Sequence, residues 1–256
     1  MLILLPPSEG KAEPRRGRCL DLDAGPLADA RRPVVESLVS LCRGPEEVAL
    51  RTLGLTPGQV DAVHRNARLL ELPTAPAERI YTGVLYDALG LTTLDASAHR
   101  RAVSRVAVLS SLYGLVRAGE RIAPYRLAGG VSLPGLGGVA AHWRSRLDPA
   151  VRDAAGRGLV IDLRSSTYGA FWRPAPDLAA RVVIVRVLHE VDGRRQIVSH
   201  FNKATKGRLV RAVLEDGRDA RTAPAFARLL TELGWTVEPG RATRTGTQLD
   251  VVVREL

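Results

Sequence analysis

The sequence predicts an α/β (α+β) protein in which helices flank a mixed central β-sheet. Short apolar runs that end in polar or turn-forming residues interleave with segments of helical spacing, which is the pattern of a sheet covered by helices. The chain has 256 residues, and 45% of them are hydrophobic, so it can bury a sizeable core. We therefore expect a single domain over residues 1–256, with a helical subdomain around residues 28–105.

Strands are expected where the apolar runs are short. The clearest are Leu2–Leu5, which stops at two prolines, and the runs 106–109, 159–163 and 182–188. A further strand over 196–201 is expected to pair with 182–188 across the turn at 192–195, and a last strand ends the chain.

Helices are expected where apolar residues recur every three or four positions. The segments are 27–41, 46–53, 57–70, 96–105, 139–147 and 223–233. Thr56 is a good N-cap, Pro57 suits a first helical turn and Gln59 completes a capping box. Residues 46–70 therefore have the shape of a helix-hairpin-helix element, which contacts phosphate through backbone N–H groups. A simple helical hairpin explains the same pattern.

The stretch 108–130 organises the rest of the chain. It begins as an apolar strand and then presents two serines, Tyr113, Arg117, Tyr125 and Arg126. Ser165 and Tyr168 follow the strand 159–163 in the same way. Polar groups at strand ends are typical of a ligand-facing edge in α/β proteins. The alternative is a surface loop with ordinary arginines.

A basic helix is expected from about Asn202. Lys203, Lys206, Arg208 and Arg211 place four positive charges within nine residues. A basic helix start adds the helix dipole to the side-chain charges and favours a bound anion. A solvated helix face would have the same composition.

The overall charge also favours an anionic partner. Lys and Arg total 37 against 27 Asp and Glu, which gives a net charge of +10. This balance indicates a nucleic acid, a nucleotide or a membrane surface. Arg far outnumbers Lys, however, and a biased composition inflates the Arg count without any binding role.

The sequence lacks the motifs that are typical of several classes of enzyme and metal site. The chain has two cysteines that form no metal-binding pattern, and it contains no HExxH, GxSxG or GxGxxG motif. The loop around Lys11 is not a Walker A motif either. The apolar start is too short for a signal peptide or a membrane span. We expect a cytoplasmic protein with no metal, no cofactor and no membrane partner.

Several motifs, taken together and in order, resemble one family, the YaaA-type peroxide stress proteins. They are MLILLPPSEGK at 1–11, YTG at 81–83, LSSLYGLVR at 109–117, PYRL at 124–127, IDLRSSTY at 161–168 and SHFNKATKGRLVR at 199–211.

The resemblance implies a compact α/β fold that contains a helix-hairpin-helix and a positively charged cleft. It also implies binding to duplex or branched DNA and a role in limiting oxidative DNA damage, through intracellular iron, when peroxide rises. The matching positions are Tyr113, Arg117, Tyr125, Arg126, Ser165, Tyr168, Lys203, Lys206 and Arg211. Lys11 in the opening loop and Arg208 complete the candidate DNA- or phosphate-binding set.

Two functions remain open at this point. In the first, the protein binds DNA in the peroxide stress response, with the basic residues on phosphates and a tyrosine stacked on an unpaired base. In the second, it is an enzyme that acts on a nucleotide or another phosphorylated small molecule. Lys11 or Lys203 would then hold the phosphate, and Glu9 or Asp162 would serve as acid or base. A deep pocket favours the enzyme, and a long basic channel favours DNA.

Overall fold

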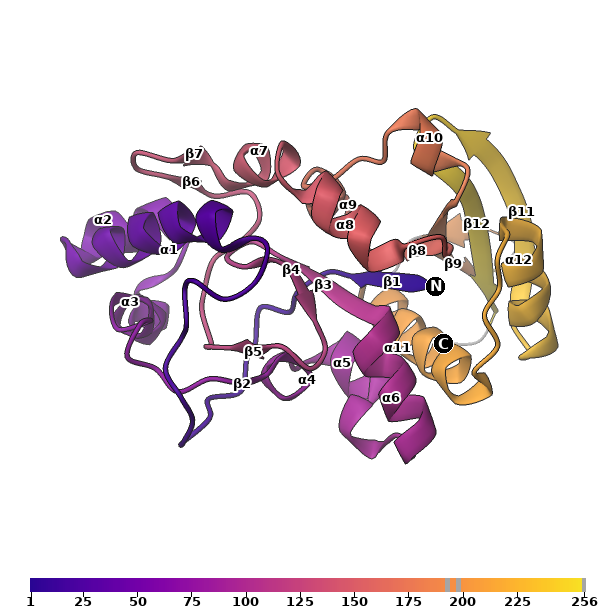
Figure 1. The fold of residues 1–256 in the computed structure, drawn as a ribbon, viewed down its shortest axis with the longest axis horizontal. Helices are drawn as coiled ribbons and strands as arrows, with labels where there is room; N and C mark the ends of the chain where they lie inside the picture. Colours follow the sequence, from indigo (N-terminus) through magenta and orange to yellow (C-terminus); the bar gives the residue numbers. More distant parts are fainter. Residues whose placement is uncertain (192–193, 197–198, 255–256) are drawn as a thin grey trace.

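The structure is a computed structural model, and it describes residues 1–191, 194–196 and 199–254. Its centre is a mixed sheet of eight strands in the order β11-β12-β9-β8-β1-β3-β4, with β10 paired to β9 (Figure 1). The strands are β1 (Leu2–Leu5), β3 (Val106–Ser110), β4 (Gly114–Arg117), β8 (Val160–Asp162), β9 (Val182–Val191), β10 (Arg194–Gln196), β11 (Thr236–Thr243) and β12 (Gly246–Val253). The five neighbouring strands β3, β1, β8, β9 and β12 run parallel to one another. The strands β4, β10 and β11 pair antiparallel with β3, β9 and β12, respectively.

Helices cover the sheet on both sides, as predicted. The helices α6 and α11 lie on one side of β1 and β3, whereas α8 lies on the other and α12 packs against β11 (Figure 1). The helices are α1 (Ala28–Arg43), α2 (Glu46–Leu53), α3 (Val60–Ala67), α4 (Ala77–Ile80), α5 (Val84–Leu89), α6 (Ala96–Arg105), α7 (Val139–Arg144), α8 (Leu147–Ala155), α9 (Ser166–Gly169), α10 (Pro176–Ala179), α11 (Ser199–Asp216) and α12 (Ala223–Glu232). Two small hairpins, β2 (Ala75–Pro76) with β5 (Arg121–Ile122) and β6 (Ser132–Leu133) with β7 (Gly137–Gly138), lie outside the sheet.

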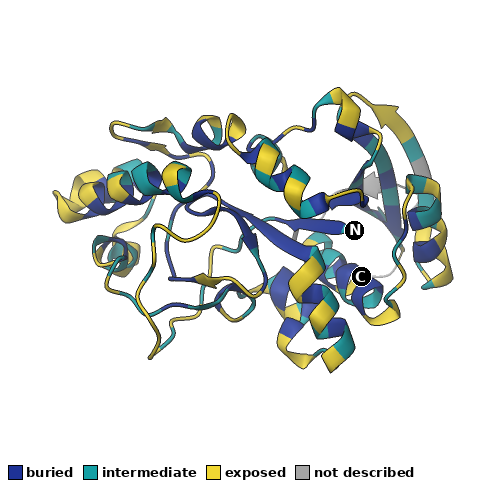
Figure 2. Ribbon diagram, viewed as in Figure 1, coloured by how far each residue is buried: buried dark blue, intermediate teal, exposed yellow. Residues whose placement is uncertain are grey.

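Strand β1 lies at the middle of the core. All four of its residues are buried, because parallel partners flank both edges and helices cover both faces (Figure 2). A strand in this position needs apolar side chains in both directions, which explains the unbroken run Leu-Ile-Leu-Leu rather than an alternating pattern.

The order of the strands creates a crevice beside β1. The chain passes from β1 through α1–α6 to β3 on one side, and it later returns to β8 on the other side of β1. The loops that leave β1 and β8 therefore diverge in opposite directions. In open α/β sheets, ligands bind in the crevice outside the carboxyl ends of the strands at such a switch point.

Five predicted strands are confirmed, the last of them as β12, and the predicted pairing with 182–188 is present as β10 on β9, but the predicted bounds of that paired strand were wrong. A strand was expected over 196–201, but β10 ends at Gln196 and α11 already begins at Ser199. The predicted turn at 192–195 lies partly outside the described residues. Tertiary packing determines that the residues from Ser199 are helical rather than extended, since α11 packs closely against α5. Gly207 permits that approach, because a Cβ at this position would collide with the backbone carbonyl of Leu85.

The segment 46–70 folds as α2, a turn, a short 3₁₀ helix (Pro57–Gln59) and α3. Gly54 takes the left-handed conformation that ends α2, with φ of +66°. The turn uses its own N–H groups: Gly54 donates to Arg51 O at 3.2 Å, Leu55 to Leu50 O at 2.8 Å and Thr56 to Gln59 Oε1 at 3.1 Å. These three donors are therefore already paired within the turn.

No helix in the described part of the chain has the length and apolar character needed to cross a membrane.

Candidate functional site

A pocket of about 700 Å³ opens at the carboxyl ends of β1 and β8. Four segments that are distant in sequence, together with Lys203 of α11, form its wall. They are the loop 6–11 after β1, the segment 82–86 at the start of α5, the segment 126–130, and Ser165, Thr167 and Tyr168 at α9. The pocket therefore occupies the crevice that the strand order creates, at the place where α/β proteins bind ligands.

A second pocket of about 580 Å³ adjoins the first. The two share Pro6, Leu85, Ser165 and Lys203 in their walls, so they form one continuous depression. The second pocket adds Asp162 at the end of β8, Arg164 after it, and Asn202 and Lys206 on α11. We call the two together the strand-end depression.

Lys11 lies against aromatic rings in the first pocket. Its Nζ is 4.1 Å from the ring centroid of Tyr125 and 5.5 Å from that of Tyr81. The same Nζ donates a hydrogen bond to Ser8 O at 2.7 Å. Lys11 also pairs with Tyr81 in an isolated antiparallel β-bridge, which holds the loop in place.

Burial lowers the pKa of Lys11 to about 7, because the charged ammonium loses its hydration. The positive charges of Arg126 and Arg65 lower the pKa further, and the negative charge of Glu9 opposes them. Glu9 does not compensate fully, since its Oε2 accepts from Arg126 Nη2 at 3.0 Å. Lys11 therefore exchanges its proton near neutral pH, which is unusual for a lysine.

Arg126 reaches the pocket from a fixed backbone. The amide side chain of Asn66 on α3 is fully buried, and it donates to Arg126 O at 2.8 Å and accepts from Arg126 N–H at 2.9 Å. Gly129, three residues later, lies so close to Tyr168 and Phe171 that a Cβ would crowd both rings. These contacts place the segment 126–130 against α9.

Arg164 organises the turn after β8. Its guanidinium pairs with both carboxylate oxygens of Asp162, at 2.8 Å and 2.6 Å, and also donates to Tyr168 O and Trp172 O. The Arg164 side chain is only 3% exposed, so this pair is a buried structural contact. Because Asp162 is committed to Arg164, it is poorly placed to act as a free base.

The stretch 109–125 forms a buried hydroxyl network. Tyr125 Oη lies 2.7 Å from Ser110 Oγ and 3.4 Å from Tyr81 Oη, and Ser110 Oγ accepts from the N–H of Tyr113 at 3.0 Å. Tyr113 and Tyr125 pack edge to face and are 1% and 2% exposed. Stacking on a base by either ring would require the core to open.

The four predicted cations of α11 divide into two pairs. Lys206 Nζ donates to Leu163 O at 2.8 Å, and Arg211 donates to Leu89 O and Gly90 O and pairs with Glu215. Both connect α11 to neighbouring segments. Lys203 and Arg208 are exposed, and within the described part of the chain neither has a carboxylate or carbonyl partner. Only this second pair is available to an external anion.

The predicted site residues thus come together in part. Lys11, Arg126, Ser165, Tyr168 and Lys203 line the first pocket, and Lys206 lines the second. Tyr125 lies beneath Lys11. Tyr113 and Arg117 line a separate pocket of about 530 Å³, and Arg117 donates to Ser104 O and Ala154 O.

Some pocket residues were not among the predicted ones. Thr82 and Tyr86 line the first pocket, and Tyr86 Oη donates to Pro6 O at 2.7 Å. The motif Tyr-Thr-Gly at 81–83 was the available signal for this segment. Nothing in the sequence placed it beside the loop 6–11, because the hydrogen bond joins residues 80 positions apart.

The depression combines three chemical features: cations for a phosphate or carboxylate, hydroxyl groups, and a lysine with a depressed pKa. Lys203 and Arg126 supply the first. Ser165 and Tyr168 supply the second, and burial raises the pKa of Tyr168, so its hydroxyl stays protonated at neutral pH. A pocket of this composition suits a phosphorylated ligand of nucleotide size.

Comparison with known proteins identifies the family. Residues 1–238 match the family described as peroxide stress protein YaaA. A UPF0246 protein of Streptomyces coelicolor is 48% identical over the full length of both chains. A UPF0246 protein of Corynebacterium efficiens is 40% identical over 93% of this chain and 95% of its own, and one of Corynebacterium glutamicum strain R is 37% identical over the same shares. The chain therefore belongs to the YaaA family of peroxide stress proteins.

Proposed function

We propose that this protein binds DNA in the cytoplasm during peroxide stress and thereby limits oxidative DNA damage. In this proposal the DNA backbone crosses the mouth of the strand-end depression, and one nucleotide unit enters the first pocket. The observation that carries the proposal is the pair of cations Lys203 and Arg126 in the wall of the first pocket, with the exposed Arg208 five residues beyond Lys203 on α11, in a chain of net charge +10. Lys203 and Arg208 have no internal partner within the described residues, so their charges can neutralise phosphates.

The helix-hairpin-helix segment has a smaller part in this proposal. Its turn donates the N–H groups of Gly54, Leu55 and Thr56 to acceptors of its own. A phosphate contact through the turn would need free N–H groups at these positions. We therefore assign the phosphate contacts to the mouth of the depression.

Fluorescence anisotropy with single-stranded, duplex and four-way-junction DNA across a salt series tests the proposal. The variant Lys203→Ala/Arg208→Ala should weaken binding about tenfold and lower the slope of log affinity against log salt by about 1.8, since each lost phosphate contact contributes about 0.9.

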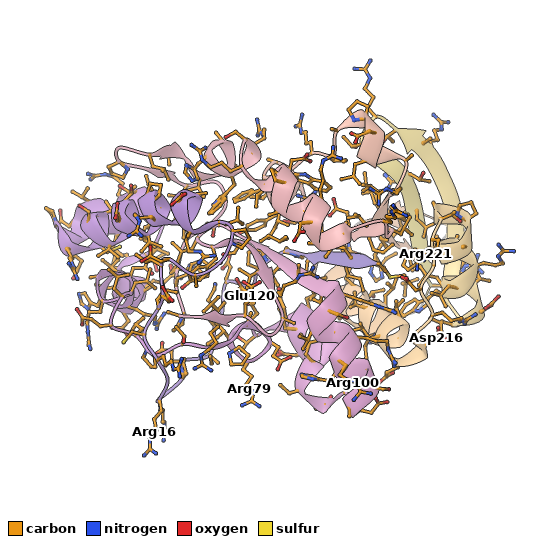
Figure 3. The ribbon with its side chains drawn as sticks, in the orientation of Figure 1. Arg16, Arg79, Arg100, Glu120, Asp216 and Arg221 are labelled. Carbon is orange, nitrogen blue, oxygen red and sulfur yellow. The ribbon has the colours of Figure 1, made fainter. Side chains whose placement is uncertain are left out.

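The matched control is Arg100→Ala/Arg228→Ala, which removes the same charge from exposed positions. Arg100 projects from α6 (Figure 3) and Arg228 lies on α12, and neither lines the strand-end depression. The control should keep the wild-type slope to within about 0.5. Equal losses in both double variants would show that net charge alone drives binding, and the proposed surface would then be wrong.

A second candidate function is an enzyme that acts on a nucleotide or another phosphorylated small molecule. The pocket itself favours it, because the pocket lies at a switch point of the sheet and contains a lysine that titrates near neutral pH. Glu9 and Asp162 are each paired with an arginine, so Lys11 is better placed than either as a base or nucleophile. Isothermal titration with nucleotides tests this candidate, and Lys203→Ala, which removes a phosphate-binding cation from the pocket wall, should reduce the heat of binding.

A further inference from the structure

The distribution of lysine in this protein is uneven. Only three of the 37 basic residues are lysines, and the rest are arginines. All three lysines line the strand-end depression: Lys11 and Lys203 in the first pocket, and Lys203 and Lys206 in the second. Arginine serves as the cation everywhere else, so charge alone does not explain lysine here. An ammonium differs from a guanidinium in that it can lose its proton and become a nucleophile.

Lys11 has the surroundings of a reactive amine. Two aromatic rings cover it, its one hydrogen bond is to Ser8 O, and the nearby carboxylate of Glu9 is held by Arg126. A neutral amine in this position can donate one N–H to Ser8 O and keep its lone pair for an electrophile. Enzymes that form imines activate their lysine by such desolvation and by a neighbouring cation.

We propose that Lys11 Nζ condenses with the aldehyde of a phosphorylated sugar held in the first pocket and forms an imine. The inference rests on the proposed function where the sugar belongs to DNA, as at an abasic site. The phosphate would lie on Arg126 and Lys203, which line the same pocket.

The step is balanced without an added oxidant or reductant. The lone pair of Nζ attacks the carbonyl carbon, and the carbonyl oxygen takes up a proton to give a carbinolamine. Loss of that oxygen as water, with a proton from Nζ, leaves the C=N bond. Tyr168 lines the pocket with a protonated hydroxyl, which supplies a donor for the departing oxygen.

Trapping with sodium cyanoborohydride tests the inference, because this reagent reduces an imine to a stable secondary amine. The probes are a duplex with one abasic site, the same duplex with the abasic aldehyde reduced to an alcohol, and free 2-deoxyribose 5-phosphate. Peptide mapping by mass spectrometry of the wild type should locate the adduct on Lys11. Mapping needs no variant, so it holds even if a substituted protein fails to fold.

The variant Lys11→Arg keeps the charge and should trap at least 50-fold less of either aldehyde. Arg228→Lys is the control, since it places a fourth lysine on the exposed face of α12 and should give no additional adduct. An adduct spread over all lysines, or undiminished in Lys11→Arg, would overturn the inference.

Binding and trapping separate the two proposals. If the reduced abasic duplex binds in the anisotropy assay but the aldehyde duplex and the sugar phosphate leave no adduct on Lys11, the imine is wrong and DNA binding stands. If the free sugar phosphate is trapped on Lys11 and no DNA binds, the imine stands and the ligand is a small molecule.

Discussion

Two regions of the molecule contain the strongest motifs of the sequence, and the structure uses them differently. The stretch 109–125 buries its serines and tyrosines in a hydrogen-bonded network inside the core. The loop 6–11 and the start of α11 instead bring lysines to the wall of an open pocket. Tyr125 connects the two regions, because its hydroxyl belongs to the network and its ring lies under Lys11.

A polar motif at a strand end can serve as structure or as a binding surface. The difference lies in whether its polar groups already have partners. Within the network, Ser110 Oγ bonds to the Tyr125 hydroxyl and accepts from Tyr113 N–H, and the Tyr113 hydroxyl donates to Ala123 O. Lys203 at the mouth has no such partner within the described residues. The buried network in the stretch 109–125 therefore positions the lysine-bearing region formed by the loop 6–11 and the start of α11.

The largest expected effect is on stability and comes from the network. Tyr113→Ala should lower the free energy of unfolding by about 3 to 5 kcal/mol, since it removes a buried aromatic ring and leaves a cavity. Denaturation with urea measures this change. Lys203→Ala, at the exposed mouth, should change stability by less than about 0.5 kcal/mol. A small loss in Tyr113→Ala would show that the network is not part of the core.

An intermediate effect should appear in the pH dependence of stability. The pKa of Lys11 is lowered in the folded protein from its usual value near 10.5 to about 7. Between these values the unfolded chain binds the proton more readily, so stability rises with pH, by at most about 1.4 kcal/mol per pH unit. Below pH 7, Lys11 is protonated in both the folded and the unfolded protein. The folded protein then bears the full free-energy cost of burying the charged ammonium.

Comparison of wild type with Lys11→Met isolates this contribution. Lys11→Met should be the more stable protein at pH 6, and its advantage should shrink between pH 7 and pH 9. Thermal unfolding at each pH measures the difference. A constant difference across this range would mean that Lys11 keeps its proton when the protein folds.

The smallest expected effect concerns the hairpin after α2. Gly58 has open space where a Cβ would lie, so Gly58→Ala should fold normally. DNA affinity should change less than about twofold, because the depression rather than the turn contacts the phosphates. A loss of DNA affinity of more than tenfold in the anisotropy assay would show that the hairpin is part of the DNA-binding surface.

The sequence predicted the fold class and much of the sheet. Strands such as Leu2–Leu5 are short, fully apolar and ended by proline, and this local pattern is sufficient to recognise them. The segment 196–201 shows the limit, since its local pattern suggested a strand whereas packing of α11 on α5 makes the residues from Ser199 helical. Contacts between distant segments override local preference at such places.

The sequence predicted which residues belong to the site better than it predicted how they are arranged and paired. Lys11, Arg126, Ser165 and Tyr168 stand out because they follow strands, and the parallel sheet brings strand ends together. Sequence cannot distinguish a free cation from one that binds a backbone carbonyl. Lys203 and Arg211 illustrate this, as they share a helix and a motif, yet only Arg211 is used to join α11 to the segment 89–93.

Nuclear magnetic resonance with ¹³Cε-labelled lysine shows directly whether Lys11 titrates near neutral pH and lies where DNA binds, because the protein should give three signals from its three lysines. The signal that Lys11→Arg removes should titrate with a midpoint near pH 7, as its pKa implies, and should shift when duplex DNA is added. A Lys11 signal with a midpoint above pH 10 that DNA leaves unmoved would show that Lys11 is an ordinary lysine outside the DNA-binding surface.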